Sequence, residues 1–354
     1  MSNVVILGAG KIGKAMARML LQSGDYTVSL CDSDPRYFGA LTQDILRIVL
    51  DVKDEVALKE ALSGADYVVS ALPFFLNPGV AKAAAATKTH YFDLTEDVKT
   101  ARAVYDISLN SDRLFMPQCG LAPGFISIVA HSLVNRFEES LDVHLRVGAL
   151  PQFPENALKY NLTWSTDGLI NEYCNPCESI VEGEMQDVLP LEGLEHFSLD
   201  GVDYEAFNTS GGIGSLCETL GGQVRNLNYK TVRYPGHRDM MQMLCQDLRL
   251  CERRDVFREI VEGGIAITHQ DVVLIFVSVK GKRHGMLEQE SFVKKIYADG
   301  DMDGYSAIQK TTSAGLCALL DLHRDGKLLQ GGYVKPETVK LEDFLENRFG
   351  SIYA

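Results

Sequence analysis

The chain has 354 residues, and its 48 acidic side chains against 34 basic ones give a formal net charge of -14. That length is enough for two domains, each with a core of its own. The negative charge disfavours nucleic acid and anionic membranes as partners, because no basic patch offsets the repulsion of a polyanion. No apolar run is long enough to span a bilayer, and the N-terminus enters a strand directly, so we expect a cytoplasmic protein.

The eight cysteines are scattered along the chain, which is typical of a reducing compartment. Cys174 and Cys177 have the C-x-x-C spacing of half a zinc site or of a redox pair, but no second close pair with ligand spacing accompanies them. The sequence therefore predicts loop cysteines here and no metal site.

The first 124 residues alternate apolar strands with helices, as in a parallel sheet that is covered on both faces. The predicted strands are 4–7, 27–31, 45–50, 67–71, 89–94 and 114–117, and the predicted helices are 11–23, 55–63, 79–87 and 98–110. Six such strands make an α/β fold, the doubly wound parallel sheet of a Rossmann dinucleotide-binding domain.

The stretch 4–13 reads VVILGAGKIG, an apolar strand that runs into Gly8, Gly10 and Gly13 and then into a helix. In this arrangement the first glycine allows a tight turn, the second admits a pyrophosphate, and the third lets helix and strand pack closely. Asp32 ends the second strand 22 residues after Gly10 and is placed to accept hydrogen bonds from an adenosine ribose. Its charge would repel a 2′-phosphate, so NAD is expected; Arg36 keeps NADP open as the lesser alternative.

In such a sheet, cofactor and substrate lie outside the carboxyl ends of the strands. Asp51 and Val52 follow the third strand and are candidates to flank an adenine, whereas the segment from Pro73 to Phe75 is a candidate pocket wall. An exposed loop is the competing interpretation for Asp51. The predicted cofactor contacts are Gly8, Gly10, Lys11, Ile12, Gly13, Asp32, Asp51, Val52, Ala71, Pro73 and Leu121.

After Gly124 the pattern changes to a helix at 125–137, a long strand at 141–150, and further strands without a second phosphate loop. Hairpin signals occur at 182–183, 200–201 and 280–282, and the apolar run 272–279 is typical of a central strand. Residues 125–310 are therefore predicted to form an α+β domain with a mixed or antiparallel sheet, which binds substrate and supports oligomers.

The tail contains a predicted helix at 311–323, a turn at 330–337 and a final amphipathic helix at 341–349. We expect this tail to return to the nucleotide domain, which then comprises 1–124 and 311–354. A homodimer or a larger homo-oligomer is expected because the second domain is rich in sheet.

The polar residues of the second domain gather in three segments, at 156–165, 205–212 and 230–237. Arg233 is a candidate for clamping a substrate carboxylate with its planar fork, and Lys230 for acting as a point charge. His237 is a candidate acid or base, with helix capping as the alternative. The substrate-binding candidates are Phe74, Tyr160, Thr209, Ser210, Lys230 and Arg233.

On GAGKIG, CGLAPG, KYNLTWS, EAFNTSGG and KTVRYPGH, the chain resembles the saccharopine dehydrogenase family, and most closely its lysine 6-dehydrogenase branch. The resemblance implies nicotinamide-dependent oxidation at a carbon that bears nitrogen, with an amino acid as the small-molecule substrate. Saccharopine-forming relatives usually have tyrosine where this chain has Phe74, and GLDPG where it has Ala122 in GLAPG. Both departures favour the lysine 6-dehydrogenase pattern.

Hydride removal from an amine carbon requires a neutral amine, and hence a base or a water held by one. Asp93, at the end of the fifth strand, is the first candidate for a catalytic group, and His237 is the second. Two alternatives stay open: reduction of an imine, as in saccharopine or carboxynorspermidine dehydrogenases, and a nucleotide-binding paralogue that has lost its chemistry.

Overall fold

The computed structural model describes residues 1–39, 44–300 and 304–354, which divide into two compact units. Unit 1 consists of Met1–Ile128 and Thr311–Ala354, and unit 2 of Val129–Lys310. The expected boundary after residue 124 thus falls four residues early, while the expected return at 311 coincides with the observed one. No helix among the described residues is both long and apolar enough to cross a membrane.

Unit 1 is built on a seven-stranded sheet in which every pairing is parallel. Its strand order is β15-β6-β5-β4-β1-β2-β3, which confirms the predicted doubly wound fold. The strands are β1 (Ser2–Leu7), β2 (Tyr26–Asp32), β3 (Leu46–Val49), β4 (Tyr67–Ser70), β5 (His90–Asp93), β6 (Leu114–Met116) and β15 (Gly332–Tyr333).

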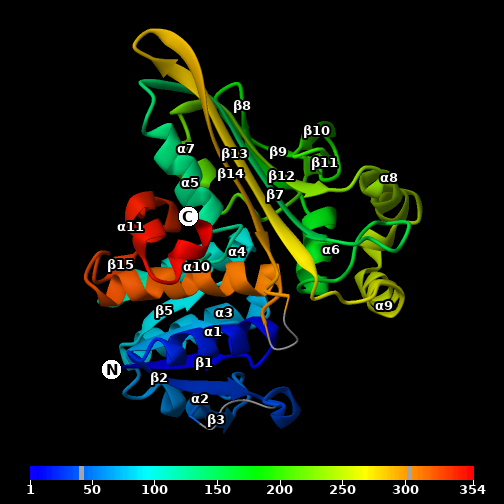
Figure 1. Ribbon diagram of the computed structural model, residues 1–354. Helices are drawn as coiled ribbons and strands as arrows, with labels where there is room; N and C mark the ends of the chain where they lie inside the picture. The colour runs from blue at the N-terminus through cyan, green and yellow to red at the C-terminus, as the bar shows by residue number, and fades with distance from the viewer. Residues whose placement is uncertain (40–43, 301–303) are drawn as a thin grey trace. The chain divides into compact units, whose positions relative to one another are not determined.

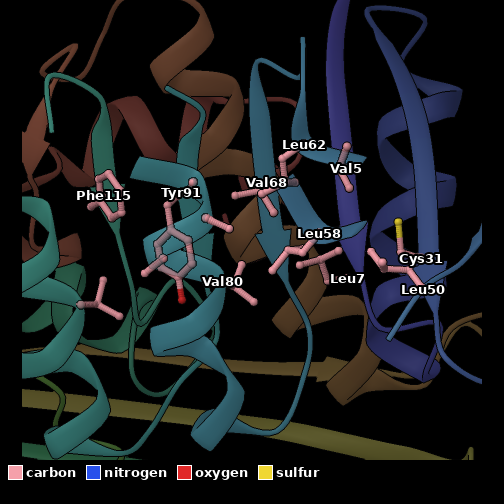
Figure 2. Close-up of a cluster of buried hydrophobic side chains, with 14 residues drawn as sticks. Val5, Leu7, Cys31, Leu50, Leu58, Leu62, Val68, Val80, Tyr91 and Phe115 are labelled. Carbon is pink, nitrogen blue, oxygen red and sulfur yellow. The ribbon is translucent and has the colours of Figure 1, made fainter. Parts of the chain in front are cut away.

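The helices of unit 1 follow the predicted pattern closely. They are α1 (Lys11–Gln22), α2 (Glu55–Leu62), α3 (Asn77–Thr87), α4 (Val98–Ser108), α10 (Ala307–Arg324) and α11 (Leu341–Glu346), and α5 (Phe125–Val134) follows β6. The core between sheet and helices is apolar (Figure 2), with Leu58 and Leu62 of α2 and Val80 of α3 packed against strand residues. Each fully buried side chain of this kind contributes about 1.5–3 kcal/mol.

The tail of the chain belongs to unit 1, as expected, but it does more than add helices. Gly332 and Tyr333 pair with Leu114 and Phe115, so β15 becomes an edge strand of the parallel sheet. The prediction of a plain turn at 330–337 was wrong here, because two residues are too few to show a strand pattern. Figure 1 shows this segment at the red end of the colour scale, beside α10 and α11.

Unit 2 contains an eight-stranded mixed sheet, as predicted, with the order β10-β11-β12-β7-β13-β14 and with β8 and β9 attached to β12. The β12 and β7 strands are parallel, and the other pairs are antiparallel. The strands are β7 (Glu139–Pro151), β8 (Cys177–Val181), β9 (Glu184–Val188), β10 (Glu195–Leu199), β11 (Val202–Asn208), β12 (Val224–Arg233), β13 (Asp271–Arg283) and β14 (Met286–Tyr297).

The helices of unit 2 are shorter, and several are irregular. They are α6 (Thr166–Cys174), α7 (Leu216–Leu220), α8 (His237–Gln242), the π-helical η3 (Met243–Asp247), the 3-10 turn η4 (Leu250–Glu252) and α9 (Arg254–Gly264). The stretch from His237 to Glu252 is therefore divided among three short elements, α8, η3 and η4.

Two of the three predicted hairpins are confirmed, and one is misplaced. The turns at Glu182 and Asp200 connect β8 to β9 and β10 to β11. The third turn lies at His284 and Gly285, which both have positive φ, and β13 continues through 280–282. Gly281 instead marks a change of register against β7, where a Cβ atom would lie 2.5 Å from the carbonyl oxygen of Glu139.

Candidate functional site

The glycine loop of unit 1 has the geometry that its sequence predicts. Gly8 has φ of +102°, and a Cβ atom at Gly13 would lie 1.9 Å from the carbonyl oxygen of Gly8, so both positions require glycine. A Cβ atom at Gly10 would meet no atom of the described residues within 4 Å. Gly10 is also the N-cap of α1 and supplies no side chain to its first turn. The loop thus leaves open space at a helix N-terminus, which suits a phosphate.

Asp32 joins the end of β2 to this loop. One of its carboxylate oxygens accepts a hydrogen bond from the backbone N–H of Ala9 at 2.7 Å, and the other accepts from the N–H of Asp34 at 3.0 Å. A carboxylate oxygen accepts two hydrogen bonds, so each retains capacity for a ribose hydroxyl. Arg36 pairs with Asp34 through Nε and Nη2, which gives that arginine a partner within its own turn.

The remaining predicted cofactor contacts lie near the carboxyl ends of the strands, but in different surroundings. Asp51 is exposed, and its side chain accepts from the N–H of Lys53, whereas Val52 packs partly into the core. Ala71 is half-buried against Gly8, and Leu121 is buried. Lys11 and Ile12 lie in the first turn of α1. Pro73 is exposed and precedes the 3-10 turn Phe74–Leu76.

Asp93, the first candidate for a catalytic group, is enclosed by hydrogen-bond donors. It has no exposed surface, and its two oxygens accept four hydrogen bonds, from Tyr91 Oη at 2.6 Å, Asn77 Nδ2 at 3.2 Å, Thr95 N at 2.9 Å and Gln118 N at 2.9 Å. Burial raises the pKa of this carboxyl, against the four hydrogen bonds, which favour the charged form. The group therefore ties β5 to α3 and to the segment after β6.

In unit 2, three predicted or neighbouring side chains form a directional hydrogen-bond chain. Nε of Arg233 donates to the hydroxyl of Tyr173 at 3.1 Å, and that hydroxyl lies 3.0 Å from Nε2 of His237. Nδ1 of His237 lies 2.8 Å from the carbonyl oxygen of Leu158, which can only accept, so Nδ1 carries the proton and Nε2 accepts from Tyr173. The sequence offered no motif that singles out Tyr173.

The surroundings of His237 contradict the expectation that its ring titrates near neutral pH. The ring is completely buried, and burial together with the nearby Arg233 lowers the pKa of His237 to about 3. The alternative of capping is also wrong, since Gly236 is the N-cap of α8. The carboxylate of Glu205 accepts from the N–H groups of Gly236 and Arg238 instead.

Arg233 is only 3 % exposed and is already held by its surroundings. Its guanidinium also donates to the carbonyl oxygen of Val232, lies 4.9 Å from the ring centre of Tyr160 and has an Nη2 atom 3.6 Å from the Glu172 carboxylate. The hydroxyl of Tyr160 is buried without a hydrogen bond of standard geometry. A substrate carboxylate would have to compete with Glu172 for this fork.

Lys230 does not join the Arg233 cluster. Residues three apart on a strand point to opposite faces of the sheet. Nζ of Lys230 donates to Glu195 at 3.0 Å and to the carbonyl oxygen of Gly193 at 2.5 Å, and Arg146 pairs with the same Glu195. The two predicted cations therefore belong to separate clusters.

Thr209 lies on the Arg233 face, and its hydroxyl is 2.8 Å from that of Thr231. Ser210 is half-buried, and its backbone N–H donates to the carbonyl oxygen of Glu172. A Cβ atom at Gly212 would fall 2.2 Å from the Tyr229 ring, so this glycine provides a close approach for protein rather than for ligand. Together with the Glu205 cap, these contacts join the EAFNTSGG segment to the KTVRYPGH segment.

A cavity of about 180 Å³ lies next to this cluster. Tyr160, Tyr173 and His237 form its polar wall, and the rest is mostly apolar: Leu158, Leu169, Met241, Leu244, Ile260, Val261, Gly264 and Ile265. Such a lining suits an apolar group of a few atoms.

The fold and the glycine loop define a dinucleotide-binding protein of the Rossmann class, with residues that fit the phosphates and ribose of a nicotinamide cofactor. Residues 4–113 match the family model described as saccharopine dehydrogenase NADP binding domain, and residues 120–348 match the saccharopine dehydrogenase C-terminal domain. The chain belongs to the saccharopine dehydrogenase family.

Several curated proteins are similar to this chain at low sequence identity. A saccharopine dehydrogenase [NADP(+), L-glutamate-forming] of Saccharomyces cerevisiae is 25% identical over 52% of this chain and 44% of its own length, and one of Pyricularia oryzae is 22% identical over 90% and 76%. A mitochondrial alpha-aminoadipic semialdehyde synthase of Bos taurus is 21% identical over 84% of the chain and 33% of its own length. The chain thus spans less than half the length of two of these three relatives.

Solved structures confirm the fold. Apo saccharopine dehydrogenase (L-Glu forming) from Saccharomyces cerevisiae superposes with a TM-score of 0.80 at 18% identity, covering 97% of this chain and 96% of the other. A homospermidine synthase from Legionella pneumophila in complex with NAD gives a TM-score of 0.70 at 12% identity, covering 99% and 89%. The narrower likeness to the lysine 6-dehydrogenase branch stays a prediction.

Proposed function

We propose that this protein is an NAD-dependent oxidoreductase that acts on a carbon–nitrogen centre of an amino acid, with oxidative deamination of the lysine 6-dehydrogenase type as the specific reaction. In that reaction a terminal ammonium group, NAD⁺ and water give an aldehyde, ammonium, NADH and one proton. The cofactor supplies the hydride acceptor. One observation supports the choice of NAD as the cofactor. The Asp32 carboxylate lies at the end of β2, where it accepts a hydrogen bond from the backbone N–H of Ala9.

The preference for NAD follows from charge. A 2′-phosphate near Asp32 would place two anions close together, whereas ribose hydroxyls find acceptors there. Arg36, the cation that would favour NADP, forms a bidentate pair with Asp34. Asp32→Asn removes the charge and should weaken NADH binding while narrowing the gap between NADH and NADPH, measured by cofactor fluorescence. Equal affinity of the wild type for both cofactors would contradict the preference.

The amino-acid half of the proposal rests on family membership, on Phe74 and on Ala122, which depart from the saccharopine-forming pattern in the same direction. Within it, we propose different roles for Asp93 and His237. Both side chains are buried, and described residues form hydrogen bonds with each of them. We propose that they position neighbouring residues rather than accept a proton.

An experiment can distinguish between two roles for Arg233, binding of the substrate and support of the internal cluster. If Arg233 clamps the substrate carboxylate, Arg233→Lys raises KM strongly, because a point charge cannot reproduce the fork. If the guanidinium serves the internal cluster, the same variant loses stability and keeps its KM. Lys230→Arg is the matched control, because that side chain lies in the other cluster.

Imine reduction is the second candidate, and a specific observation favours it: relatives named saccharopine dehydrogenase, and a homospermidine synthase fold, are among the similar proteins. One panel tests all three possibilities, with NAD or NADP and L-lysine, saccharopine or carboxynorspermidine. NADH formation from lysine alone supports deamination, and turnover of a secondary amine alone supports the second candidate. Cofactor binding without any turnover supports the inactive paralogue.

We also propose that the protein acts as a homodimer or a larger homo-oligomer. The strand that supports this is β14, a 12-residue strand at the end of the unit 2 sheet. Light scattering on the purified chain measures the assembly directly, and a monomer at all concentrations would remove the proposal.

A further inference from the structure

Three cysteines of unit 2 converge, although they are far apart in the sequence. Cys174 ends α6 and is joined by a disulfide to Cys251 of η4, which lies 77 positions further along the chain, with 5.3 Å between their Cα atoms. The sulfur of Cys245, in η3, completes a group in which all three sulfurs lie within 4.8 Å of one another. The C-x-x-C pair considered from the sequence is not the one formed, because Cys177 is a separate buried thiol on β8.

Irregular backbone brings two of these cysteines to the third. The π-helical turn of η3 is closed by a hydrogen bond from Leu248 N to Met243 O at 2.9 Å, five residues back. Arg249 then has φ of +54°, and η4 begins immediately after it. Single π turns and residues in the left-handed region cost free energy and gather at functional sites. A regular helix through this stretch would rotate Cys245 away from Cys251.

The cluster is held by contacts other than the disulfide. Arg254, at the start of α9, donates from Nη1 to Asn171 at 2.8 Å and from Nη2 to Asn175 at 2.6 Å, which ties it to both sides of Cys174. Cys245 is itself part of the apolar core that contains Met241 and Leu250. Reduction of the disulfide therefore leaves the three sulfurs close together.

The sulfur spacing suits a metal ion. Zinc–thiolate bonds of about 2.3 Å place the sulfurs of one site about 3.8–4.0 Å apart, whether the site is tetrahedral or trigonal. Thiolates are soft ligands that select thiophilic cations over Mg²⁺ or Ca²⁺. Three thiolates leave a further position for water or another ligand.

We propose that the reduced form of this chain binds one thiophilic d¹⁰ cation, such as Zn²⁺, through Cys174, Cys245 and Cys251. Reduction by a dithiol transfers two electrons and two protons to the disulfide, so that Cys174 and Cys251 become thiols and the reductant becomes a disulfide. Metal binding then releases the three thiol protons to the solvent. In the oxidised form only Cys245 keeps a thiol, so the site exists only after reduction.

Metal binding at this site should change the shape of the neighbouring cavity. Tyr173 and Leu244, which line the cavity, are the residues directly before Cys174 and Cys245. A metal ion needs sulfurs about 3.8 Å apart, whereas the disulfide draws two of them into a covalent bond. Exchanging one state for the other therefore moves the sulfurs of Cys174 and Cys251 apart, next to residues that line the cavity.

The experiment titrates the reduced, full-length chain with Cd²⁺, a spectroscopic substitute for Zn²⁺, after removal of the reductant under nitrogen. The expected result is a thiolate-to-cadmium absorption band that saturates at one equivalent and is absent from the oxidised chain. Cys245→Ser should weaken binding by at least about tenfold, the range seen when even an outer partner of a metal ligand is lost. Cys177→Ser, a buried thiol outside the cluster, should bind as the wild type does.

A second readout avoids variants altogether. In the reduced wild type, Zn²⁺ should protect Cys174, Cys245 and Cys251 from alkylation, mapped by peptide mass spectrometry, and leave the accessibility of Cys177 and Cys217 unchanged. The proposal is overturned if the reduced chain shows no cadmium band. It is equally overturned if Cys245→Ser binds as tightly as the wild type, or if zinc protects none of the three.

Discussion

The hydroxyl of Tyr173 accepts a hydrogen bond from Nε of Arg233 at 3.1 Å and donates one to the neutral ring of His237. Tyr173→Phe removes both bonds at once, so the buried Nε of Arg233 and the buried Nε2 of His237 lose the partner that they share. We expect unit 2 to lose about 2–4 kcal/mol of stability, because an unsatisfied buried group costs its desolvation free energy.

Denaturant unfolding followed by the fluorescence of Trp164, the single tryptophan, reports on unit 2. Tyr105→Phe on α4, an exposed ring, is the control and should change stability by no more than about 0.5 kcal/mol. Equal stabilities of the two variants would show that the Arg233 bond is dispensable.

The glycines of the phosphate loop should separate folding from binding. Gly13→Ala should cost about 3 kcal/mol or more, because its Cβ atom would overlap the carbonyl oxygen of Gly8. Gly10→Ala meets no protein atom and should fold normally, yet weaken NADH at least about tenfold, or about 1.4 kcal/mol, by crowding the pyrophosphate. Melting temperature and NADH fluorescence measure the two effects; unchanged NADH affinity in Gly10→Ala would place the cofactor elsewhere.

His237 should make unit 2 sensitive to acid. Its pKa is about 3 in the folded chain, against 6.5 as the reference value, so the unfolded chain binds an extra proton between these values. Stability is fully present above pH 6.5 and falls by about 1.4 kcal/mol for each unit below it. The stability difference between wild type and His237→Gln should therefore shrink by about 2 kcal/mol from pH 6.5 to 5.

Met241→Leu changes the same cavity wall without a titratable group, so its offset from the wild type should stay constant with pH. A constant offset for His237→Gln as well would mean that the ring is protonated in the folded chain. Urea unfolding at several pH values gives both differences.

Asp93→Asn should impair the fold more than the chemistry. Oδ1 accepts from the N–H groups of Thr95 and Gln118, and Oδ2 accepts from Tyr91 and Asn77, so an amide nitrogen at either position meets donors. We expect a loss of about 3 kcal/mol with kcat within twofold below the melting temperature. Asp97→Asn, the N-cap of α4, is the control and should change stability by no more than about 0.5 kcal/mol, because asparagine caps a helix as well as aspartate does. A large fall in kcat at an unchanged melting temperature would restore Asp93 as a catalytic group.

The parts of the fold that the sequence predicts are those in which neighbours along the chain carry the signal. Alternating apolar strands and helices located β1 to β6, and the glycine spacing located the loop because each glycine has a local steric reason. Asp32 was found for the same reason, since its distance from Gly10 is set by one strand–helix–strand unit.

What the sequence did not reveal depends on partners far along the chain. The Cys174–Cys251 bridge, the Glu205 cap of α8 and the two-residue β15 have no periodicity of their own. Tyr173 belongs to no motif. The sequence already showed that Lys230 and Arg233 do not belong to one cluster. They lie an odd number of positions apart on one strand, so the alternation of side chains assigns them to opposite faces of the sheet.

The return of the chain to unit 1 has a consequence for synthesis on the ribosome. The strand β15 is translated after unit 2, whereas its partner in the parallel sheet, β6, is translated before it. During translation the continuous unit 2 can complete its sheet while the nucleotide unit still exposes the edge of β6. An unpaired strand edge invites association with other chains, so the edge of β6 is most prone to aggregation in the interval before residues 332–333 emerge.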